Sequence, residues 1–279
     1  MFFNNLMKRF MRKLDKGYIS LSFDDGREDN YLVAYPILKE HNLPTTFNIA
    51  MAYVEGKMNH TQIFGMPPMT LTMLNEMAKN ELFEIAGHGY WHLNTKEDIL
   101  EGINALNSFL EKKQLTKYGN GFASPGSDLT IEDYLSIKED LDLANIRYVR
   151  ISSRFSKFPK IKLLLRKANR ILHVPFIYRF VYQDTLMEYS DNQILWSIPI
   201  LSSITYKEII SIIDLAIEEK KACVLMFHSI VDGKSIKDNW SYSTEEFNRI
   251  CMYLSQKRKE GHLDVLTSMD MFRLLSGKS

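Results

Sequence analysis

The sequence lacks the features that mark several common classes of protein. It has only two cysteines, Cys223 and Cys251, which are too few for a disulfide framework and do not have the spacing of a zinc ribbon. No stretch approaches the roughly 18 consecutive apolar residues that cross a bilayer, and neither internal repeats nor low-complexity tracts are found. The net charge is +1, so overall charge favours no particular partner. We therefore expect a soluble globular protein of one large α/β domain or two small ones.

The N-terminal leader, residues 1–17, is basic but has no continuous apolar stretch and no small-residue cleavage site. We therefore expect no signal peptide, and a location in the cytoplasm or at the inner face of the membrane. The leader is compatible with a short basic amphipathic helix and equally with a frayed polar segment.

Short apolar runs alternate with helical patterns along the rest of the chain, which predicts mostly parallel strands. We expect strands at 18–23, 45–50, 83–86, 121–124, 146–151, 194–200, 222–227 and 263–267. Two of the intervening helices should begin at capping boxes, Thr205-x-x-Glu208 and Ser243-x-x-Glu246. The chain has seven or eight strand–helix units, which favours a single barrel, spanning residues 18–279, and not two domains.

Polar clusters follow three of these strands, at the end where chemistry collects in parallel α/β folds. The first is Asp24-Asp25, followed by Gly26. Two buried carboxylates side by side would repel, unless one binds a cation and the other acts as a base. A solvated turn is the alternative, because Asp-Asp-Gly is common in turns.

The second cluster contains His88 and His92, four residues apart on one side of an expected helical turn and so able to hold one metal ion. Gly89 stands where the metalloprotease signature needs a glutamate, which disfavours that class. The third cluster ends a strongly apolar strand with His228 and Ser229. Two unrelated surface histidines and a structural histidine are the alternatives at these two places.

One carboxylate and two imidazoles form a three-ligand set with positions left for water and substrate, which is typical of a catalytic metal. Asp24 and His228 then remain to move protons. The sequence contains no G-x-S-x-G elbow and no phosphate-binding glycine loop, so no other nucleophile stands out.

In these motifs the chain resembles the polysaccharide deacetylases of the NodB-like group, carbohydrate esterase family four. Ser22 to Gly26 matches the family's T/S-F-D-D-G motif, His88 and His92 match its H-x-x-x-H motif, and Leu225 to His228 matches its last motif, Leu-x-His or a near variant. The resemblance extends over roughly residues 18–275 and includes the linking segments at 35–38, 43–47 and 84–88.

The resemblance implies a distorted (β/α)7-type barrel, a single domain with a basic helical insertion at about 150–192. It also implies that Asp25, His88 and His92 hold one divalent metal, most often zinc, although cobalt, nickel or iron suit the same ligands. Asp24 would then be the catalytic base and His228 the catalytic acid.

Oxyanion and substrate contacts are expected from Pro125, Gly126 and Trp91. The sequence departs from the family where its R-x-P-x-G motif has an arginine that orients the catalytic aspartate, because Ala123 stands there. The family also has an Asp/Trp motif that lines the substrate groove. Trp240 and Trp196 are the two candidates for its tryptophan, and Trp196 is better explained by packing in the core.

Residues 147–179 carry ten Lys or Arg and no acidic residue. An apolar helical face is formed there by residues 161, 164, 165, 168, 171 and 172, with Lys and Arg on the other side. Such a helix can contact an anionic membrane or a lipid-linked glycan. The alternative is a helix packed on the barrel with a solvated basic face. Nucleic acid is not expected as a partner.

The expected function is metal-dependent hydrolysis of N-acetyl, or O-acetyl, groups on an amino-sugar carbohydrate or a cell-surface polysaccharide precursor. A weak or inactive carbohydrate-binding relative, and a hydrolase of another non-peptide C–N bond, are the alternatives.

Overall fold

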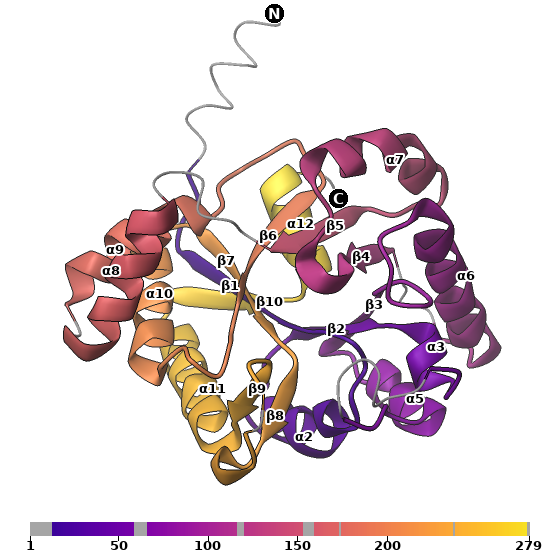
Figure 1. Ribbon diagram of the computed structural model, residues 1–279, viewed down its shortest axis with the longest axis horizontal. Coiled ribbons are helices and arrows are strands. Elements are labelled where there is room, and N and C mark those ends of the chain that lie inside the picture. Colours follow the sequence, from indigo (N-terminus) through magenta and orange to yellow (C-terminus); the bar gives the residue numbers. More distant parts are fainter. Residues whose placement is uncertain are drawn as a thin grey trace, which may run out of the picture.

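The computed structural model describes residues 13–58, 66–115, 120–152, 159–172, 174–236 and 238–277. Most of the leader, residues 1–12, therefore lies outside the described residues. Seven parallel strands form a closed barrel surrounded by helices (Figure 1), as the sequence predicts. These strands are β1 (Gly17–Phe23), β2 (Thr45–Ile49), β3 (Phe83–Gly87), β4 (Gly121–Ala123), β5 (Tyr148–Ser152), β6 (Ile194–Pro199) and β7 (Ala222–Phe227).

The barrel is distorted at β1, where the ring closes. One edge of β1 pairs with β7 from Tyr18 to Phe23. Its other edge pairs first with β10 (Leu263–Leu266), from Gly17 to Ser20, and only then with β2, from Leu21 to Phe23. An eighth strand therefore fills the lower part of the ring, and seven strands reach the end at which the polar clusters lie.

Helices connect the strands and cover the outside of the barrel (Figure 1). After β1 the chain forms a π-helical turn, η1 (Asn30–Ala34), followed by α2 (Tyr35–Glu40). The other α-helices are α3 (Met51–Val54), α5 (Leu71–Lys79), α6 (Lys96–Lys112), α7 (Ile131–Leu143), α8 (Pro159–Leu172), α9 (Pro175–Tyr182), α10 (Tyr206–Glu219), α11 (Thr244–Lys259) and α12 (Ser268–Ser276). None of the described helices is both long and apolar enough to cross a membrane.

Several short elements complete the fold. Three are 3-10 turns, η2 (Pro125–Ser127), η3 (Gln183–Thr185) and η4 (Gly233–Ser235). Two short strands, β8 (Ser229–Val231) and β9 (Ser241–Ser243), pair beside the barrel. The sequence does not predict these two strands, because three residues are too few to show an alternating pattern.

Serine and threonine side chains begin six of the helices. Each accepts a hydrogen bond from the backbone N–H three residues on, as expected of a helix N-cap. Of the two expected capping boxes the first half is formed, since Thr205 caps α10 and Ser243 caps α11. The carboxylate of Glu208 does not complete its box but pairs with Arg166 and Arg170 of α8. The box pattern identifies the start of the helix but not the partner of Glu208.

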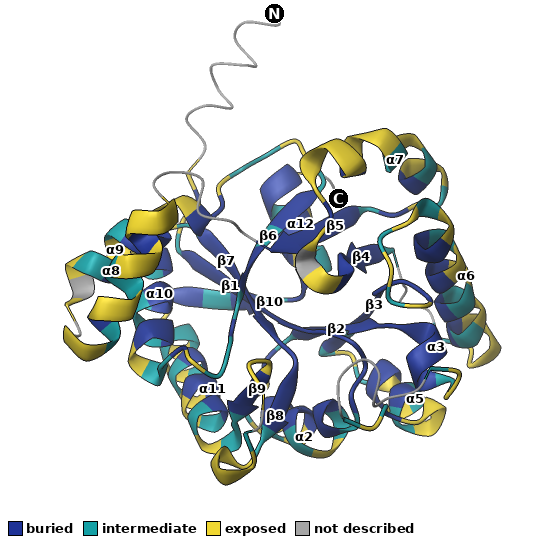
Figure 2. Cartoon of the chain, viewed as in Figure 1, coloured by how far each residue is buried: buried dark blue, intermediate teal, exposed yellow. Residues whose placement is uncertain are grey.

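Side chains that alternate along the strands separate an apolar outer layer from a polar interior. Phe23 stacks on Phe47 and Phe227, its register partners on β2 and β7, and the edge of Phe247 from α11 meets it. Cys223 and Cys251 are free and buried, as apolar residues would be. Figure 2 shows the strands almost entirely buried. The interior therefore offers a dry, polar environment to groups at its upper end.

Candidate active site

The three polar clusters meet at the carboxyl ends of β1, β3 and β7. Asp24 and Asp25 directly follow β1, His88 follows β3 and His228 follows β7. These four side chains are buried, and Asp25 and His88 are almost completely inaccessible. The structure thus brings together the residues that the sequence selects from places more than 200 positions apart.

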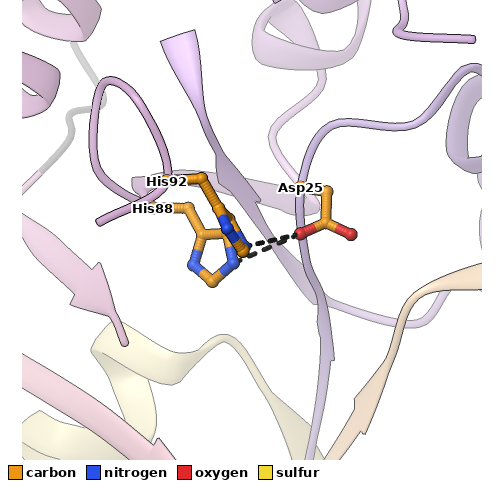
Figure 3. Close-up of side chains that lie close together, drawn as sticks. All are labelled: Asp25, His88 and His92. Atoms are coloured by element: carbon orange, nitrogen blue, oxygen red, sulfur yellow. Dashed lines mark ion pairs between the residues drawn. The ribbon is translucent and has the colours of Figure 1, made fainter. Parts of the chain in front are cut away.

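Asp25, His88 and His92 form a compact group of possible metal ligands (Figure 3). The Nε2 atoms of His88 and His92 each lie 3.3 Å from Oδ1 of Asp25, and one ligand atom from each residue falls within 4.8 Å of the others. Among the described residues, this buried Oδ1 has no hydrogen-bond partner. A carboxylate oxygen and two imidazole nitrogens that face one point fit a divalent cation, and their chemistry fits zinc.

In two of the possible ligands, His88 and Asp25, the polar atom that does not face the metal position is hydrogen-bonded to a neighbouring residue. Nδ1 of His88 lies 2.8 Å from the carbonyl oxygen of Ala123, to which it can donate, and this leaves the lone pair on Nε2 free for a metal. Oδ2 of Asp25 accepts a hydrogen bond of 2.8 Å from Nε of Arg27, whose Nη1 donates to Ser229. Burial raises the pKa of Asp25, but Arg27 and the two imidazoles outweigh it and hold that pKa well below its usual range.

The loop that carries His88 and His92 is not the helical turn that the sequence predicts. Residues 88–92 form no helix, and both Gly89 (φ 76°) and His92 (φ 62°) have a left-handed backbone. His92 therefore reaches the site because the loop folds back, which brings the two rings to a 4.8 Å separation. The structure brings the two imidazoles together, but not on the helical turn that their i, i+4 spacing predicts.

Asp98, in the first turn of α6, holds this loop. Its carboxylate accepts hydrogen bonds from the backbone N–H groups of Tyr90, Trp91 and Leu93, at 3.1, 2.7 and 2.9 Å. Gly102, one turn further on, packs so closely that a Cβ there would stand 2.4 Å from the backbone of Gly89. The sequence does not identify Asp98 as a supporting residue, because an acidic residue in the first turn of a helix usually has no role beyond the helix dipole.

Replacing Asp98 with asparagine should weaken metal binding without unfolding the barrel. The amide has the same shape but a single acceptor oxygen for three N–H groups, so the loop loses its anchor. We expect zinc affinity to fall by about tenfold or more, which is the usual effect of removing a residue that orients the metal ligands. Isothermal titration of the metal-free protein measures this, and the exposed neighbour Glu97→Gln is the control. Unchanged affinity would show that Asp98 does not position His92.

The second carboxylate, Asp24, is held by Arg150. One guanidinium nitrogen of Arg150, Nη2, lies 2.8 and 2.6 Å from the two carboxylate oxygens, and Nη1 donates to Ser197. Asn48 donates a further hydrogen bond to Oδ1 of Asp24. Burial raises the pKa of Asp24, but Arg150, with His88 and His228, outweighs it and keeps that pKa below its usual value. Asp24 is therefore charged at neutral pH.

Arg150 stands beside the position at which the sequence lacks its expected arginine. It pairs in register with Ala123 on the neighbouring strand, so its guanidinium enters the barrel one strand away from the motif position. The sequence offers a weak signal for it, a single charged residue within the apolar run of β5. The run predicts a strand, but only the register between β4 and β5 shows that the side chain of Arg150 lies beside position 123.

His228 faces Asp24 from across the site. Its Nε2 lies 3.9 Å from Oδ2 of Asp24, and the ring of Trp240 packs on its imidazole with centroids 4.4 Å apart. Nδ1 is buried without a hydrogen-bond partner among the described residues. Burial lowers the pKa of His228 to about 4, despite the opposing effect of Asp25 and Asp24. The imidazole is therefore neutral near pH 7.

The expected substrate residues lie around this group. Pro125 and Gly126 begin the turn η2, directly after β4 and Ser124. The carbonyl oxygen of Pro125 accepts a hydrogen bond from Asn94, which ties this turn to the histidine loop. Trp91 is exposed, while Trp196 packs against the core, as expected for it. Trp240 is thus the better placed of the two groove candidates.

Comparison with protein families gives one match, to the family described as polysaccharide deacetylase, over residues 11–145. This range includes Asp24, Asp25, His88 and His92, whereas Arg150 and His228 lie beyond it. A search of curated proteins finds no match.

Among solved structures, the chain is similar to IcaB from Ammonifex degensii, with 20% identity and a TM-score of 0.37, over 47% of this chain and 57% of that one. It is similar to the Xyl-CE4 domain of a multidomain xylanase from the hindgut metagenome of Trinervitermes trinervoides (13% identity, TM-score 0.47, 93% and 91%). A CE4 family pseudoenzyme from Bacillus anthracis is also similar (13%, 0.47, 92% and 66%). The chain spans little more than half the length of IcaB.

Proposed function

Because the chain belongs to the polysaccharide deacetylase family, we propose that it is a metal-dependent hydrolase that removes N-acetyl groups, or O-acetyl groups, from an amino-sugar carbohydrate. The observation that carries the proposal is the buried Oδ1 of Asp25, which faces two imidazole nitrogens at 3.3 Å beside a second, charged carboxylate. A structural metal site would have no use for that second carboxylate, whereas hydrolysis needs a base beside the metal.

Asp25, His88 and His92 would hold the metal, with zinc the first candidate and cobalt, nickel or iron the others. When bound, the metal supplies Lewis-acid polarisation of the acetyl carbonyl and lowers the pKa of a water to about 7. Arg27 would keep Oδ2 of Asp25 occupied, so that Oδ1 is the oxygen presented to the cation.

Asp24 would act as the base that takes a proton from the attacking water. Its low pKa keeps it ionised, and Arg150 and Asn48 orient its two oxygens. Arg150 is in this scheme a positioning residue that substitutes for the arginine missing at Ala123.

His228 would deliver a proton to the leaving nitrogen, which needs one because an amide anion is a very poor leaving group. Since His228 is neutral near pH 7, the proton has to reach it during the reaction. Asp24 is the source within reach: the proton taken from water would pass to Nε2, 3.9 Å away, and on to the nitrogen. The C–O bond to the water oxygen would form as Asp24 takes the proton, and the C–N bond would break as that proton reaches the nitrogen. The products are the amine and acetic acid, which loses its proton to give acetate.

The negative charge that develops on the acetyl oxygen would be stabilised by a hydrogen-bond donor of the protein. The backbone N–H of Gly126, after Pro125, is the candidate, since η2 directly follows the strand whose Ala123 carbonyl supports His88. Trp91 and Trp240 offer exposed aromatic faces for a sugar ring.

The substrate would be a cell-surface polysaccharide or its precursor. The site of action would be the inner face of an anionic membrane, or a lipid-linked glycan. The exposed Lys160 and Lys167 within the basic segment 147–179 support this part of the proposal. An inactive carbohydrate-binding relative is the second candidate. The absence of the motif arginine at position 123 favours this second candidate. The contact between Arg150 and Asp24 argues against it, because Arg150 supplies a guanidinium to the same carboxylate.

The test of the activity is acetate release from a panel of N-acetylglucosamine oligomers and O-acetylated sugars. Release that Asp24→Asn abolishes would support the proposal and rank its substrates. If the purified, zinc-loaded protein binds a sugar of the panel but releases no acetate from any, the binding relative becomes the better description.

Removing the imidazole of His228 should slow turnover while the metal stays bound. We expect His228→Ala to lower kcat on N-acetyl substrates by about 10²-fold or more, the usual contribution of a general acid. The loss should be smaller on O-acetyl substrates, because an alkoxide leaves more readily than an amide anion. Zinc content is measured alongside, and the exposed His262→Ala is the control. Equal loss of zinc and activity would contradict the assignment.

A further inference from the structure

Helix α8 packs against the protein with its basic face. Lys162 is buried and pairs with Asp184 at 2.7 Å, and Arg166 and Arg170 pair with the buried Glu208 of α10 at 2.7 and 3.2 Å. Asn169, fully buried, hydrogen-bonds both backbone groups of Val174 and so fixes the turn into α9. The structure contradicts the alternative of a helix packed with a solvated basic face, since three of its cations are used inside.

The apolar face of α8 consequently points away from the protein. This outward face also includes the start of α9, and its exposed large side chains are Ile161, Leu163, Leu164, Ile171, Leu172, Val174 and Phe176. Leu164, Ile171 and Phe176 are 69, 82 and 75% exposed. Figure 2 shows the outer side of α8 and α9 as largely exposed, beside α10. Contiguous exposed apolar surface of this kind marks an interaction site.

The charge around the outward face narrows the choice of partner. Lys160 and Lys167 are exposed on α8, and no ion pair with a described acidic residue engages them. The nearest basic residue of α9, Arg179, is already paired with Glu218 and Glu219 of α10. The face thus combines apolar side chains with free cations and no acid, which is the composition of helices that lie on anionic bilayers.

A second copy of the chain fits this face less well. A two-fold dimer through it would place the same patch on both sides of the interface. The interface would then enclose Lys160 and Lys167 of both copies with no acidic residue of the patch to pair with them, and like charges in an apolar interface cost affinity.

We propose that the outward face of α8 and the start of α9 is a docking surface for an anionic lipid bilayer. The apolar side chains enter the interface between headgroups and acyl chains, and Lys160 and Lys167 meet the lipid phosphates. The ion pairs with Asp184 and Glu208 hold the helix in this orientation before any lipid is present. This inference goes beyond the proposed hydrolysis and does not depend on it.

Co-sedimentation of the full chain with vesicles tests the proposal, with phosphatidylglycerol–phosphatidylcholine vesicles compared with pure phosphatidylcholine. We expect binding to the anionic vesicles only, weakened at high salt. Leu164→Gln combined with Ile171→Gln should abolish it, and Lys160→Gln with Lys167→Gln should lower the partition coefficient by about 30-fold. The matched control is Leu135→Gln with Leu143→Gln, two leucines of α7 that are similarly exposed.

All these variants retain residues 1–12, whose sequence is also basic, so a loss of binding assigns the docking to the outward face. Circular dichroism and thermal unfolding verify that each variant is folded. Three outcomes would overturn the proposal: no binding of the wild type to anionic vesicles, equal binding of the Leu164 and Ile171 variant, or a wild-type dimer in solution that this variant dissociates.

Discussion

Replacing Asp25 with alanine is expected to remove the metal and, with it, nearly all acetate release. Asp25 supplies the one anionic ligand of the three, and its Oδ1 is the atom on which both imidazoles converge at 3.3 Å. A bound metal supplies several kcal/mol of transition-state stabilisation, so the rate should fall by about 10³-fold or more. Metal content after dialysis against zinc, and acetate release by the same sample, measure both effects.

Two further variants separate charge from shape at this position. Asp25→Asn retains the size of the side chain and an oxygen at Oδ1 but not the negative charge, so we expect weak zinc binding and activity close to that of the alanine variant. Asp24→Asn should bind zinc and still be inactive, because this variant lacks the catalytic base but retains all three metal ligands. If Asp25→Ala binds zinc as the wild type does, the ligand assignment is wrong.

Replacing Arg150 with glutamine should have the second largest effect, on stability as well as on catalysis. Arg150 and Asp24 are both buried and within 2.6 Å of each other. Removing one partner of such a pair leaves an uncompensated buried charge and costs about 3–5 kcal/mol of the free energy of unfolding. Thermal and denaturant unfolding at pH 7 measure this loss, and the exposed Arg273→Gln provides the reference.

The catalytic effect of Arg150→Gln should depend on pH. Arg150 opposes the effect of burial and holds the pKa of Asp24 below its usual value. Without it, that pKa rises, and the base is ionised only at higher pH. The acidic limb of the kcat/KM profile should therefore move to higher pH, with activity partly recovered as the pH increases. A uniform loss at every pH would show that Arg150 has only a structural role.

A second substitution tests whether the guanidinium or the strand position matters. Ala123 and Arg150 are register partners on neighbouring strands, and Ala123 occupies the place at which the family motif has its arginine. We expect Arg150→Ala with Ala123→Arg to recover most of the activity that Arg150→Ala loses, and to return the acidic limb towards that of the wild type. No recovery by a folded double variant would contradict this interchange of positions.

The barrel and the position of its polar clusters were predictable from local patterns in the sequence. The apolar runs of β1, β3 and β7 are long enough to identify as strands, and each is followed at once by polar residues. Because parallel strands bring their carboxyl ends together, Asp25, His88 and His228 had to meet. The pairing of β10 with part of β1 was not predictable, since it depends on register rather than on pattern.

The residues that support the site were not predictable, because their roles arise from tertiary contacts. Arg150 needs the register of β4 and β5, Asp98 needs the fold of the histidine loop, and the backbone of that loop departs from the helical turn that its spacing suggests. The orientation of α8 is a further case. The sequence shows its two faces, but only the ion pairs with Asp184 and the buried Glu208 determine that the basic one turns inward.

Metal-dependent hydrolysis with Asp24 as the base is tested most directly by measuring acetate release by the purified protein before chelation, after chelation and after zinc is restored. The Asp24→Asn variant is treated in the same way. We expect release to disappear with the chelator and to return with about one zinc per chain, while Asp24→Asn takes up the same zinc and releases nothing. Release that persists in the fully metal-free protein, or a return of activity in Asp24→Asn, would contradict this expectation.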